Sequence, residues 1–225
     1  MVFGAHVTEE PCIQFVASNI PGTQLFCADS VYARDAGPGQ IRSIAHIGDP
    51  APGGGTFQYA YAAKVNNSGQ IVFLGALAAH PKGTGHLPLD SNSGVFLHSG
   101  DKNIALVRPG DALPGGGRLA TAGFFTIDVW INNAGVVSFS AQLDTSTGGV
   151  PDTGLYTWSS GTLTLVARSG TVIPGVGTIQ ALQPPVAVGA PYPVSGAAIN
   201  DRGQIVFQAT LTAGRGVILL ATPTQ

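Results

Sequence analysis

The stretch Gly48-Asp49-Pro50-Ala51-Pro52-Gly53 decides the fold, because it recurs along the chain. It returns as Gly-Asp-Ala-Leu-Pro-Gly at residues 110–115 and, with a threonine in place of the aspartate, as Gly-Thr-Val-Ile-Pro-Gly at residues 170–175. Asp49, Asp111 and Thr171 are 62 and 60 positions apart. A period of this length indicates one structural unit that is copied along the chain.

A second motif keeps step with the first. Asn-Ser-Gly-Gln-Ile-Val-Phe at residues 67–73 is matched at residues 133–139 and 201–207. An asparagine followed two positions later by glycine is typical of a type I turn closed by a left-handed glycine at a bulge. Pro-Gly, as at residues 52–53, is typical of a type II turn, because proline presets φ and glycine accepts a positive φ. Both motifs therefore mark turns between short segments.

Four short apolar segments fall between these turns in each unit. One follows the Asn-x-Gly turn, as in Ile71–Leu77, and a second contains Gly94–His98, which we match to residues 154–158 and 216–220. A third leads into the Gly-Asp turn, and a fourth, clearest at residues 125–131, precedes Asn-x-Gly. Because large apolar residues alternate with small or polar ones and no capped 3.6-residue pattern is sustained, the segments are predicted to be strands.

These units predict an all-β, β-propeller-like array of four-stranded antiparallel blades, with about three and a half repeats of roughly 60–68 residues. A β-sandwich or a β-solenoid built from the same units is the alternative. We expect a single domain over residues 1–225, divided into a partial blade 1–47, blades 48–109 and 110–169, and a partial blade 170–225. This division gives three, four, four and three strands. We therefore expect either self-association, with a homodimer completing the ring, or a chain that is part of a longer repeat protein.

Composition narrows the classes of function. The net charge is −2 with only three lysines, so nucleic-acid binding through phosphates is disfavoured. No apolar run reaches the roughly 18 residues of a membrane span, and the first residues lack a signal-peptide pattern. Cys12 and Cys27 could form a local disulfide or remain free thiols. Scarce lysine, abundant glycine, serine and threonine, and a disulfide would suit an exported protein, either periplasmic or extracellular.

The motifs as a set resemble an uncharacterised bacterial family of exported tandem-repeat proteins. Its units carry Asn-x-x-Gly-x-Val-x-Phe-x-Ala-x-Leu, then a Gly-Ile/Val-Tyr strand, then Gly-Asp-x-x-Pro-Gly. The resemblance implies a propeller-like fold and export, and it supplies no reaction. Two departures are Thr171, at the aspartate position, and a proline-rich insertion at residues 183–195.

The recurring polar residues have structural explanations. Asp49 and Asp111 precede Pro-Gly turns, where an aspartate caps backbone N–H groups, and Thr171 can do the same. His46, Arg108 and Arg168 share one repeat position three residues earlier. That position indicates a structural pairing or a solvated strand face, with ligand binding as the less favoured alternative.

Other residues could carry chemistry. Asn66, Asn132 and Asn200 recur before the Asn-x-Gly turn and could offer side-chain oxygens to Ca²⁺ around a central channel. Asp128 is the single carboxylate in a segment expected to line that channel. Residues 78–93 hold two histidines and an oxygen-rich Asp-x-Asn. The predicted catalytic residues are His80, His86 and Asp128, and the predicted metal ligands are Asp90, Asn92, Asp128 and Asn132.

Two functions follow from these observations. The first is an exported binding or assembly module that takes a small-molecule or polysaccharide ligand or a second copy of the chain. The alternative is a calcium-dependent hydrolase acting on a lactone or another ester. Propeller lactonases are similar in general architecture, and that similarity implies Ca²⁺ polarising the substrate carbonyl. Whether the protein is an enzyme stays open, and we expect its specific function where the repeat is broken, at residues 8–30, 78–93, 144–153 and 183–195.

Overall fold

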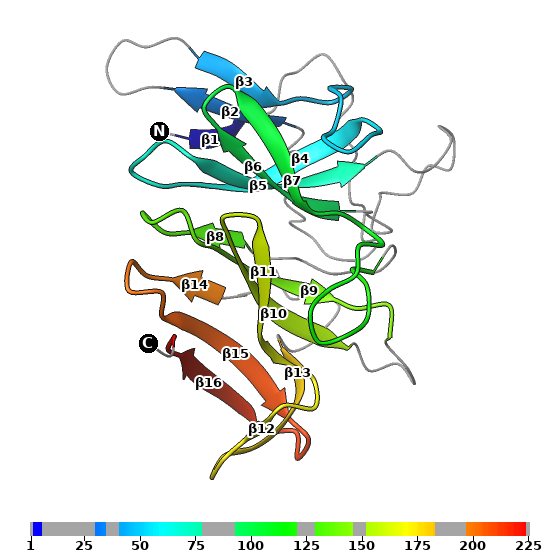
Figure 1. Ribbon diagram of the computed structural model, residues 1–225, viewed down its shortest axis with the longest axis vertical. Coiled ribbons are helices and arrows are strands. Elements are labelled where there is room, and N and C mark those ends of the chain that lie inside the picture. Colours follow the sequence, from blue (N-terminus) through cyan, green and yellow to red (C-terminus); the bar gives the residue numbers. More distant parts are fainter. Residues whose placement is uncertain are drawn as a thin grey trace, which may run out of the picture.

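The computed structural model is a row of antiparallel β-sheets. It describes residues 2–5 (backbone), 30–34, 41–77, 93–120, 129–145, 152–182 and 197–223. These residues form four sheets, stacked in chain order along the long axis of the molecule (Figure 1). No helix in the described part of the chain has the length and apolar character that a membrane crossing needs. The predicted all-β, propeller-like array is confirmed, and the row of sheets is open rather than closed into a ring.

The second sheet shows the complete unit. Its four strands hydrogen-bond in chain order, as a meander. Every residue of the second strand is buried, because another sheet packs against each of its faces. The strands are β4 (Phe57–Val65), β5 (Ile71–Leu77), β6 (Ser93–Ser99) and β7 (Lys102–Val107).

The first and third sheets have the same antiparallel order. The first has three strands and the third has four. The first sheet consists of β1 (Val2–Ala5), β2 (Ser30–Arg34) and β3 (Ile41–Ala45). The third consists of β8 (Val129–Ile131), β9 (Val137–Gln142), β10 (Thr153–Ser159) and β11 (Thr162–Arg168).

The fourth sheet has five strands, not the three that the sequence predicts. Two of them, β13 and β14, pair with successive parts of β15, through Leu182 opposite Ala209 and Ala197 opposite Phe207. One strand of the unit is thus interrupted by residues 183–196, and the short β12 adds a hairpin to β13. The strands are β12 (Val172–Ile173), β13 (Gly177–Leu182), β14 (Ala197–Ile199), β15 (Ile205–Leu211) and β16 (Gly216–Ala221).

Both predicted turn types are confirmed. At the Asn-x-Gly turn, Gly69 has a φ of +77° and donates its N–H to the carbonyl of Asn66 at 3.1 Å. At the Pro-Gly turn, Gly53 has a φ of +86°, and Gly54 donates to the carbonyl of Ala51 at 2.9 Å. Only glycine adopts such positive φ angles without strain, which is why the motifs keep it.

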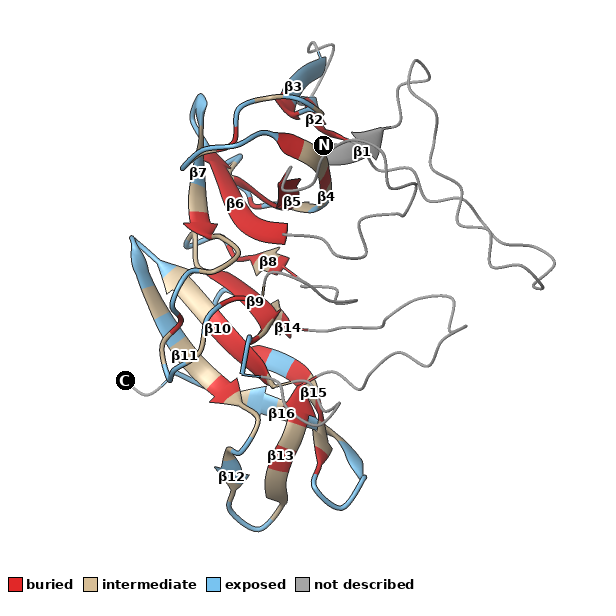
Figure 2. Cartoon of the chain, turned by 90° about the vertical axis from the view of Figure 1, so that its right-hand side faces the viewer, coloured by how far each residue is buried: buried red, intermediate tan, exposed pale blue. Residues whose placement is uncertain are grey.

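The second and third sheets each pack on two neighbours, through two different faces. We call the face directed at the next sheet in chain order the leading face and the opposite one the trailing face. In the second sheet, Leu74 and Val95 lie on the leading face and pack on the third sheet, whereas Phe73 and Phe96 lie on the trailing face and pack on the first. A third cluster joins the third sheet to the fourth. Buried residues therefore concentrate along the middle of the row (Figure 2).

The register corrects one sequence match. Gly94 lies opposite Gly75 in the second sheet, but the equivalent position in the fourth sheet, opposite Ala209, is held by Val217 rather than by Gly216. A tight turn closed by the N–H of Leu211 and the carbonyl of Arg215, at 2.9 Å, sets this register. The match between these strands is therefore shifted by one residue, which exchanges the two faces of β16.

Candidate functional site

Five of the six predicted site residues lie outside the described residues: His80, His86, Asp90, Asn92 and Asp128. Cys12 and Cys27 lie outside them too. The catalytic and Ca²⁺-binding roles of the five site residues and the disulfide between the two cysteines stay predictions. Within the described ranges, no group of three or more His, Cys, Asp or Glu side chains could hold a metal ion.

Asn132, the sixth residue, belongs to a ladder that joins successive sheets. It is buried, and its Oδ1 accepts the N–H of Val136 across its own turn at 2.9 Å. Its Nδ2 donates to the carbonyl of Asn200 in the fourth sheet at 3.0 Å. Asn66 donates in the same way to the carbonyl of Asn132, also at 3.0 Å. Oδ1 of Asn132, which the calcium hypothesis assigns to the metal, thus accepts a backbone N–H in this structure, and its binding of Ca²⁺ stays a prediction.

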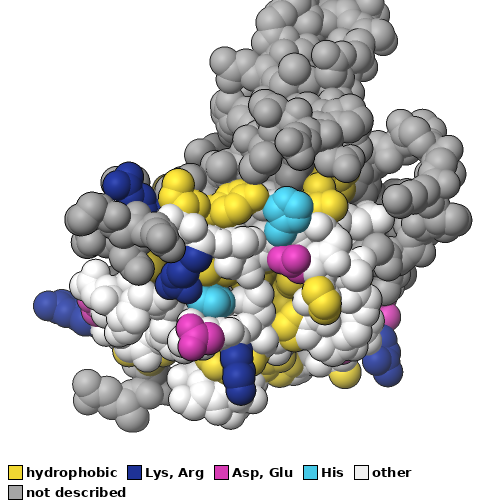
Figure 3. All heavy atoms as spheres, turned by 90° about the horizontal axis from the view of Figure 1, so that it is seen from above, with side chains coloured by type: hydrophobic (Ala, Val, Ile, Leu, Met, Phe, Trp, Pro, Cys, Tyr) yellow, Lys and Arg dark blue, Asp and Glu magenta, His cyan; other side chains and the backbone are white. Residues whose placement is uncertain are grey.

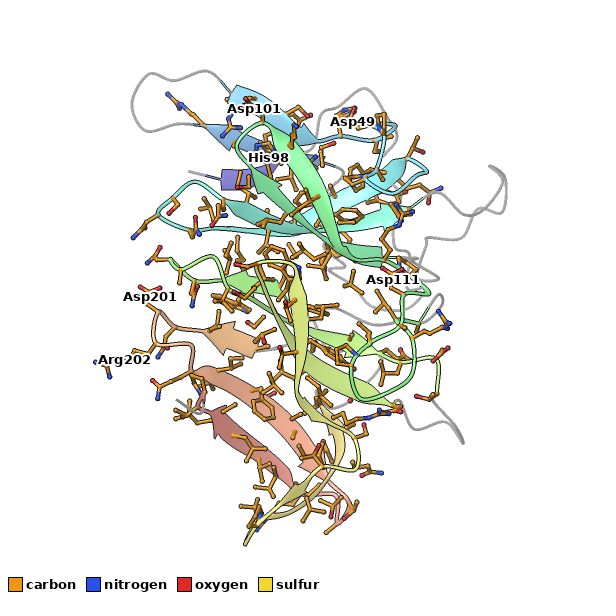
Figure 4. The ribbon with its side chains drawn as sticks, in the orientation of Figure 1. Asp49, His98, Asp101, Asp111, Asp201 and Arg202 are labelled. Atoms are coloured by element: carbon orange, nitrogen blue, oxygen red, sulfur yellow. The ribbon has the colours of Figure 1, made fainter. Side chains whose placement is uncertain are left out.

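A second row of hydrogen bonds runs beside this ladder. The N–H of Asn67 donates to Oδ1 of Asn133, and the N–H of Asn133 donates to Oδ1 of Asp201, both at 2.8 Å. The amide of Asn133 adds a bond to Oδ2 of Asp201 at 2.8 Å. These bonds, from the backbone of Asn133 and then from its side chain, lower the pKa of Asp201. Figure 4 shows Asp201 at the turn between β14 and β15, beside the third-sheet turn.

The recurring Asp/Thr position caps its own turn. Oδ2 of Asp49 accepts the N–H of His46 at 2.8 Å, and Oδ2 of Asp111 accepts the N–H of Arg108 at the same distance. In the third copy, Oγ1 of Thr171 accepts the N–H of Arg168 at 3.0 Å. The prediction of local capping is confirmed, and the threonine is explained because its hydroxyl replaces the carboxylate as acceptor.

The arginines at the shared repeat position donate hydrogen bonds to backbone carbonyls of the preceding repeat, a contact that we call the clasp. The guanidinium of Arg108 donates to the carbonyls of Pro52 and Gly54, the latter at 2.8 Å. A Cβ at Gly53 would lie 2.6 Å from Nη1 of Arg108, so the clasp requires glycine there. Arg168 repeats the arrangement at the carbonyls of Gly115 and Gly116. The structural-pairing interpretation therefore holds for both arginines.

An acid–base group surrounds Arg168 next to the broken segment 144–153. Oδ2 of Asp152 lies 2.7 Å from Nη2 of Arg168 and accepts the hydroxyl of Thr145 at 2.5 Å. Burial raises the pKa of Tyr156, against the opposing effect of the Arg168 cation, and the charge of Asp152 raises it further. A tyrosine with a raised pKa keeps its proton at neutral pH, so it does not supply a base.

A second polar group, which the sequence analysis did not single out, joins the first two sheets. Nη1 of Arg42 in β3 lies 3.0 Å from Nε2 of His98 in β6. Because arginine only donates, Nε2 accepts and the proton is on Nδ1, which donates to Oδ1 of Asn103 at 2.8 Å. Asn103 in turn donates to the carbonyl of Ile44 at 2.7 Å.

The buried His98 is thus a hydrogen-bond bridge between sheets (Figure 4). A signal was available in the sequence, since His98 and Trp158 hold equivalent positions opposite Ile71 and Val137. A histidine in the second sheet stands where the third sheet has a large aromatic side chain.

Comparisons with known proteins place the chain in a family without giving it an activity. The chain belongs to a family of unknown function, DUF7453, whose profile matches residues 16–221. No curated protein matches the chain. One similar solved structure is an X-ray structure provisionally named as a gluconolactonase, with 18% sequence identity and a TM-score of 0.38. The match covers 87% of this chain and 58% of that one, so the chain spans less than two thirds of its length.

Proposed function

We propose that this protein is a non-catalytic binding or assembly module built on a propeller-like scaffold. One observation carries the proposal: the described recurring polar residues are engaged within the scaffold. The asparagines at 66 and 132 tie one sheet to the next, and the arginines at 108 and 168 clasp the preceding turn. The acids at 49 and 111 cap their own turns.

The physical reason lies in what such hydrogen bonds leave available. Withdrawing one of these side chains for chemistry would leave backbone groups unpaired, at a cost of about 1–3 kcal/mol for each buried group. The repeated polar residues therefore stabilise the scaffold by hydrogen bonding. The outer faces and connecting loops are available for a partner. The partner would be a small molecule, a polysaccharide or a second copy of the chain. Export belongs to the same proposal and is supported by the composition alone.

The alternative, a calcium-dependent hydrolase of lactones or esters, stays a prediction. It depends chiefly on residues outside the described ranges, and Asn132, the exception, is engaged in the ladder. This hypothesis requires Ca²⁺ to polarise a carbonyl and a histidine or an acid to transfer a proton.

A hydrolysis assay separates the two functions. Purified protein is offered a panel of lactones and esters, with and without EDTA, and its melting temperature is measured in both conditions. The module predicts hydrolysis at the background rate and a melting temperature that EDTA does not change. Asp128→Ala tests the predicted acid, and Asp101→Ala, at the turn between β6 and β7 (Figure 4), is the matched control. Turnover that the first substitution abolishes and the second preserves would contradict the module.

A further inference from the structure

The leading face of the fourth sheet exposes apolar side chains to solvent. Val206 of β15 is 46% exposed, and Ile218 and Leu220 of β16 are 72% and 59% exposed. The register places Val206 directly opposite Leu220, so these residues share one face of the sheet. The other face of the same strands, with Phe207 and Leu219, packs on the third sheet.

The equivalent residues of the second sheet are all buried. Val72 lies opposite Leu97, as Val206 lies opposite Leu220, and Val95 takes the position of Ile218. The three second-sheet residues are at most 2% exposed, because the third sheet covers them. The fourth sheet thus carries an apolar face of the type that another sheet covers elsewhere in the same chain.

The first sheet offers the matching surface. Each covered trailing face has a large apolar pair at one register position: Phe73 opposite Phe96, Phe139 opposite Tyr156, and Phe207 opposite Leu219. In the first sheet, the same position pairs Phe3 with Tyr32. Ile41, on the same face as Tyr32 by the alternation of β2 and β3, is 59% exposed.

One chain cannot join its own two surfaces. The first and fourth sheets lie at opposite ends of the long axis (Figure 1). Figure 3 looks onto the first-sheet end, where hydrophobic side chains are interspersed with charged and histidine side chains. A contact between a leading face and a trailing face is heterologous, so it closes into a ring or continues as an open chain.

We propose that the leading face of the fourth sheet binds the trailing face of the first sheet in a second copy, and that two copies close head to tail. Two chains, each with the four sheets that its described residues form, give eight, which is within the roughly four to eight blades of known propellers, whereas three chains exceed it. The partner is thus a second copy of this chain, and the inference rests on the proposed function as an assembly module.

The first test is the solution mass of the 225-residue protein by light scattering over a range of concentrations. Wild type has the mass of a dimer, and Ile218→Asp weakens association by about tenfold or more, because it places a charge in an apolar contact. Ile104→Asp is the matched control, since Ile104 is 40% exposed but lies in β7 of the second sheet, outside both proposed surfaces. A monomeric wild type overturns the inference, as does equal weakening by both substitutions.

The second test addresses the head-to-tail arrangement. Ile41→Asp changes the exposed trailing side and weakens the dimer as Ile218→Asp does. An equimolar mixture of the two variants recovers a dimer, because one contact between an unchanged leading face and an unchanged trailing face remains. If Ile41→Asp leaves the dimer unchanged, or the mixture recovers none, the head-to-tail arrangement is wrong. Circular dichroism of each variant confirms that mass is compared between folded chains.

This inference and the proposed function fail on different readouts. A monomer without turnover overturns the second copy as partner and leaves a binding module. A dimer with lactone turnover that depends on Asp128 overturns the non-catalytic module and leaves the interface. Mass and turnover are measured on the same preparation.

Discussion

The leading faces of the second and third sheets solve the same packing problem with different chemistry. Each face is covered by the next sheet, and the same register positions supply the contact. The second sheet uses four apolar side chains, whereas the third uses two serines, a leucine and a threonine. In register order these are Val72, Leu74, Val95 and Leu97 in the second sheet, and Ser138, Ser140, Leu155 and Thr157 in the third.

The difference reflects what each face meets. The second sheet meets an apolar surface, where Phe139 stacks on Tyr156 with ring centroids 5.6 Å apart. The third sheet meets the interrupted strand of the fourth, and the fully buried Ser138 donates to the carbonyl of Ala197 at 2.6 Å. The first contact is apolar at these four positions, whereas the second adds a directional hydrogen bond to the apolar cluster that joins the third and fourth sheets. A repeat can therefore keep its backbone geometry while the chemistry of its leading face changes.

The largest expected effect comes from truncating the apolar contact. Leu97→Ala lowers the free energy of unfolding by about 2–5 kcal/mol, because a cavity replaces a leucine that is 2% exposed. Its register equivalent, Leu220→Ala, stays within about 0.5 kcal/mol at protein concentrations where the chain is monomeric. Chemical denaturation of both variants measures the difference. Equal losses would show that the two faces are not distinguished by their covering.

The second-largest effect is expected from the asparagine ladder, which spans the interfaces of the third sheet with the second and the fourth. Asn132→Ala leaves the N–H of Val136 without its acceptor and removes one of two hydrogen bonds to the carbonyl of Asn200, which also accepts the N–H of Gly203 at 2.9 Å. The expected loss is about 1–3 kcal/mol, because the asparagine is buried. Chemical denaturation measures this loss of stability. Asn92→Ala, at a position outside the described residues, is a second variant that tests the calcium prediction. A ladder role predicts that the Asn132 variant loses the same stability with EDTA as without it.

Removing the Ser138 hydroxyl from the third sheet should have a smaller effect on the free energy of unfolding. Ser138→Ala removes the donor to the carbonyl of Ala197 and lowers the free energy of unfolding by about 1 kcal/mol. Ser43→Ala, at an exposed position in β3, is the control and should be neutral. If Ser138→Ala is also neutral, the contact between the third and fourth sheets depends on apolar packing in the same way as its neighbour.

The smallest effect concerns pH at the exposed row. Because the pKa of Asp201 is lowered in the folded state, its bonds to Asn133 contribute stability above the usual aspartate pKa. That contribution is lost as the pH falls through the lowered pKa. The difference in melting temperature between wild type and Asp201→Asn should therefore shrink towards acid pH. A difference that is constant with pH would mean that the carboxylate charge has no part in this row.

The turns were the most predictable part of this fold. Glycines at 53 and 69 were expected to adopt a positive φ from their neighbours alone, and they do. The local cap by Asp49 followed from the same short-range chemistry. The shifted register of β16 could not be obtained in this way, because a one-residue difference in strand match leaves the turn motif unchanged.

The candidate site was likewise predictable only in part: the sequence indicated possible roles for its residues but not their long-range partners. The sequence raised pairing, a solvated face and ligand binding for Arg108, but the carbonyls that it reaches belong to a turn 54 and 56 residues earlier. His98 was missed for the same reason, since its partner Arg42 is 56 residues away in another sheet. Long-range hydrogen-bond partners are set by how sheets stack, and no local pattern specifies them.

The sequence by itself determined the period, the turns and the all-β character of this protein, because backbone conformation at glycine and proline and the alternation of strands are local properties. Tertiary structure alone decided which polar residues fasten one sheet to another and which apolar face is uncovered. Leucines at equivalent register positions are buried at Leu97 and exposed at Leu220. The physical reason is that burial is a property of the neighbour: the third sheet covers Leu97, and no described sheet of this chain covers Leu220.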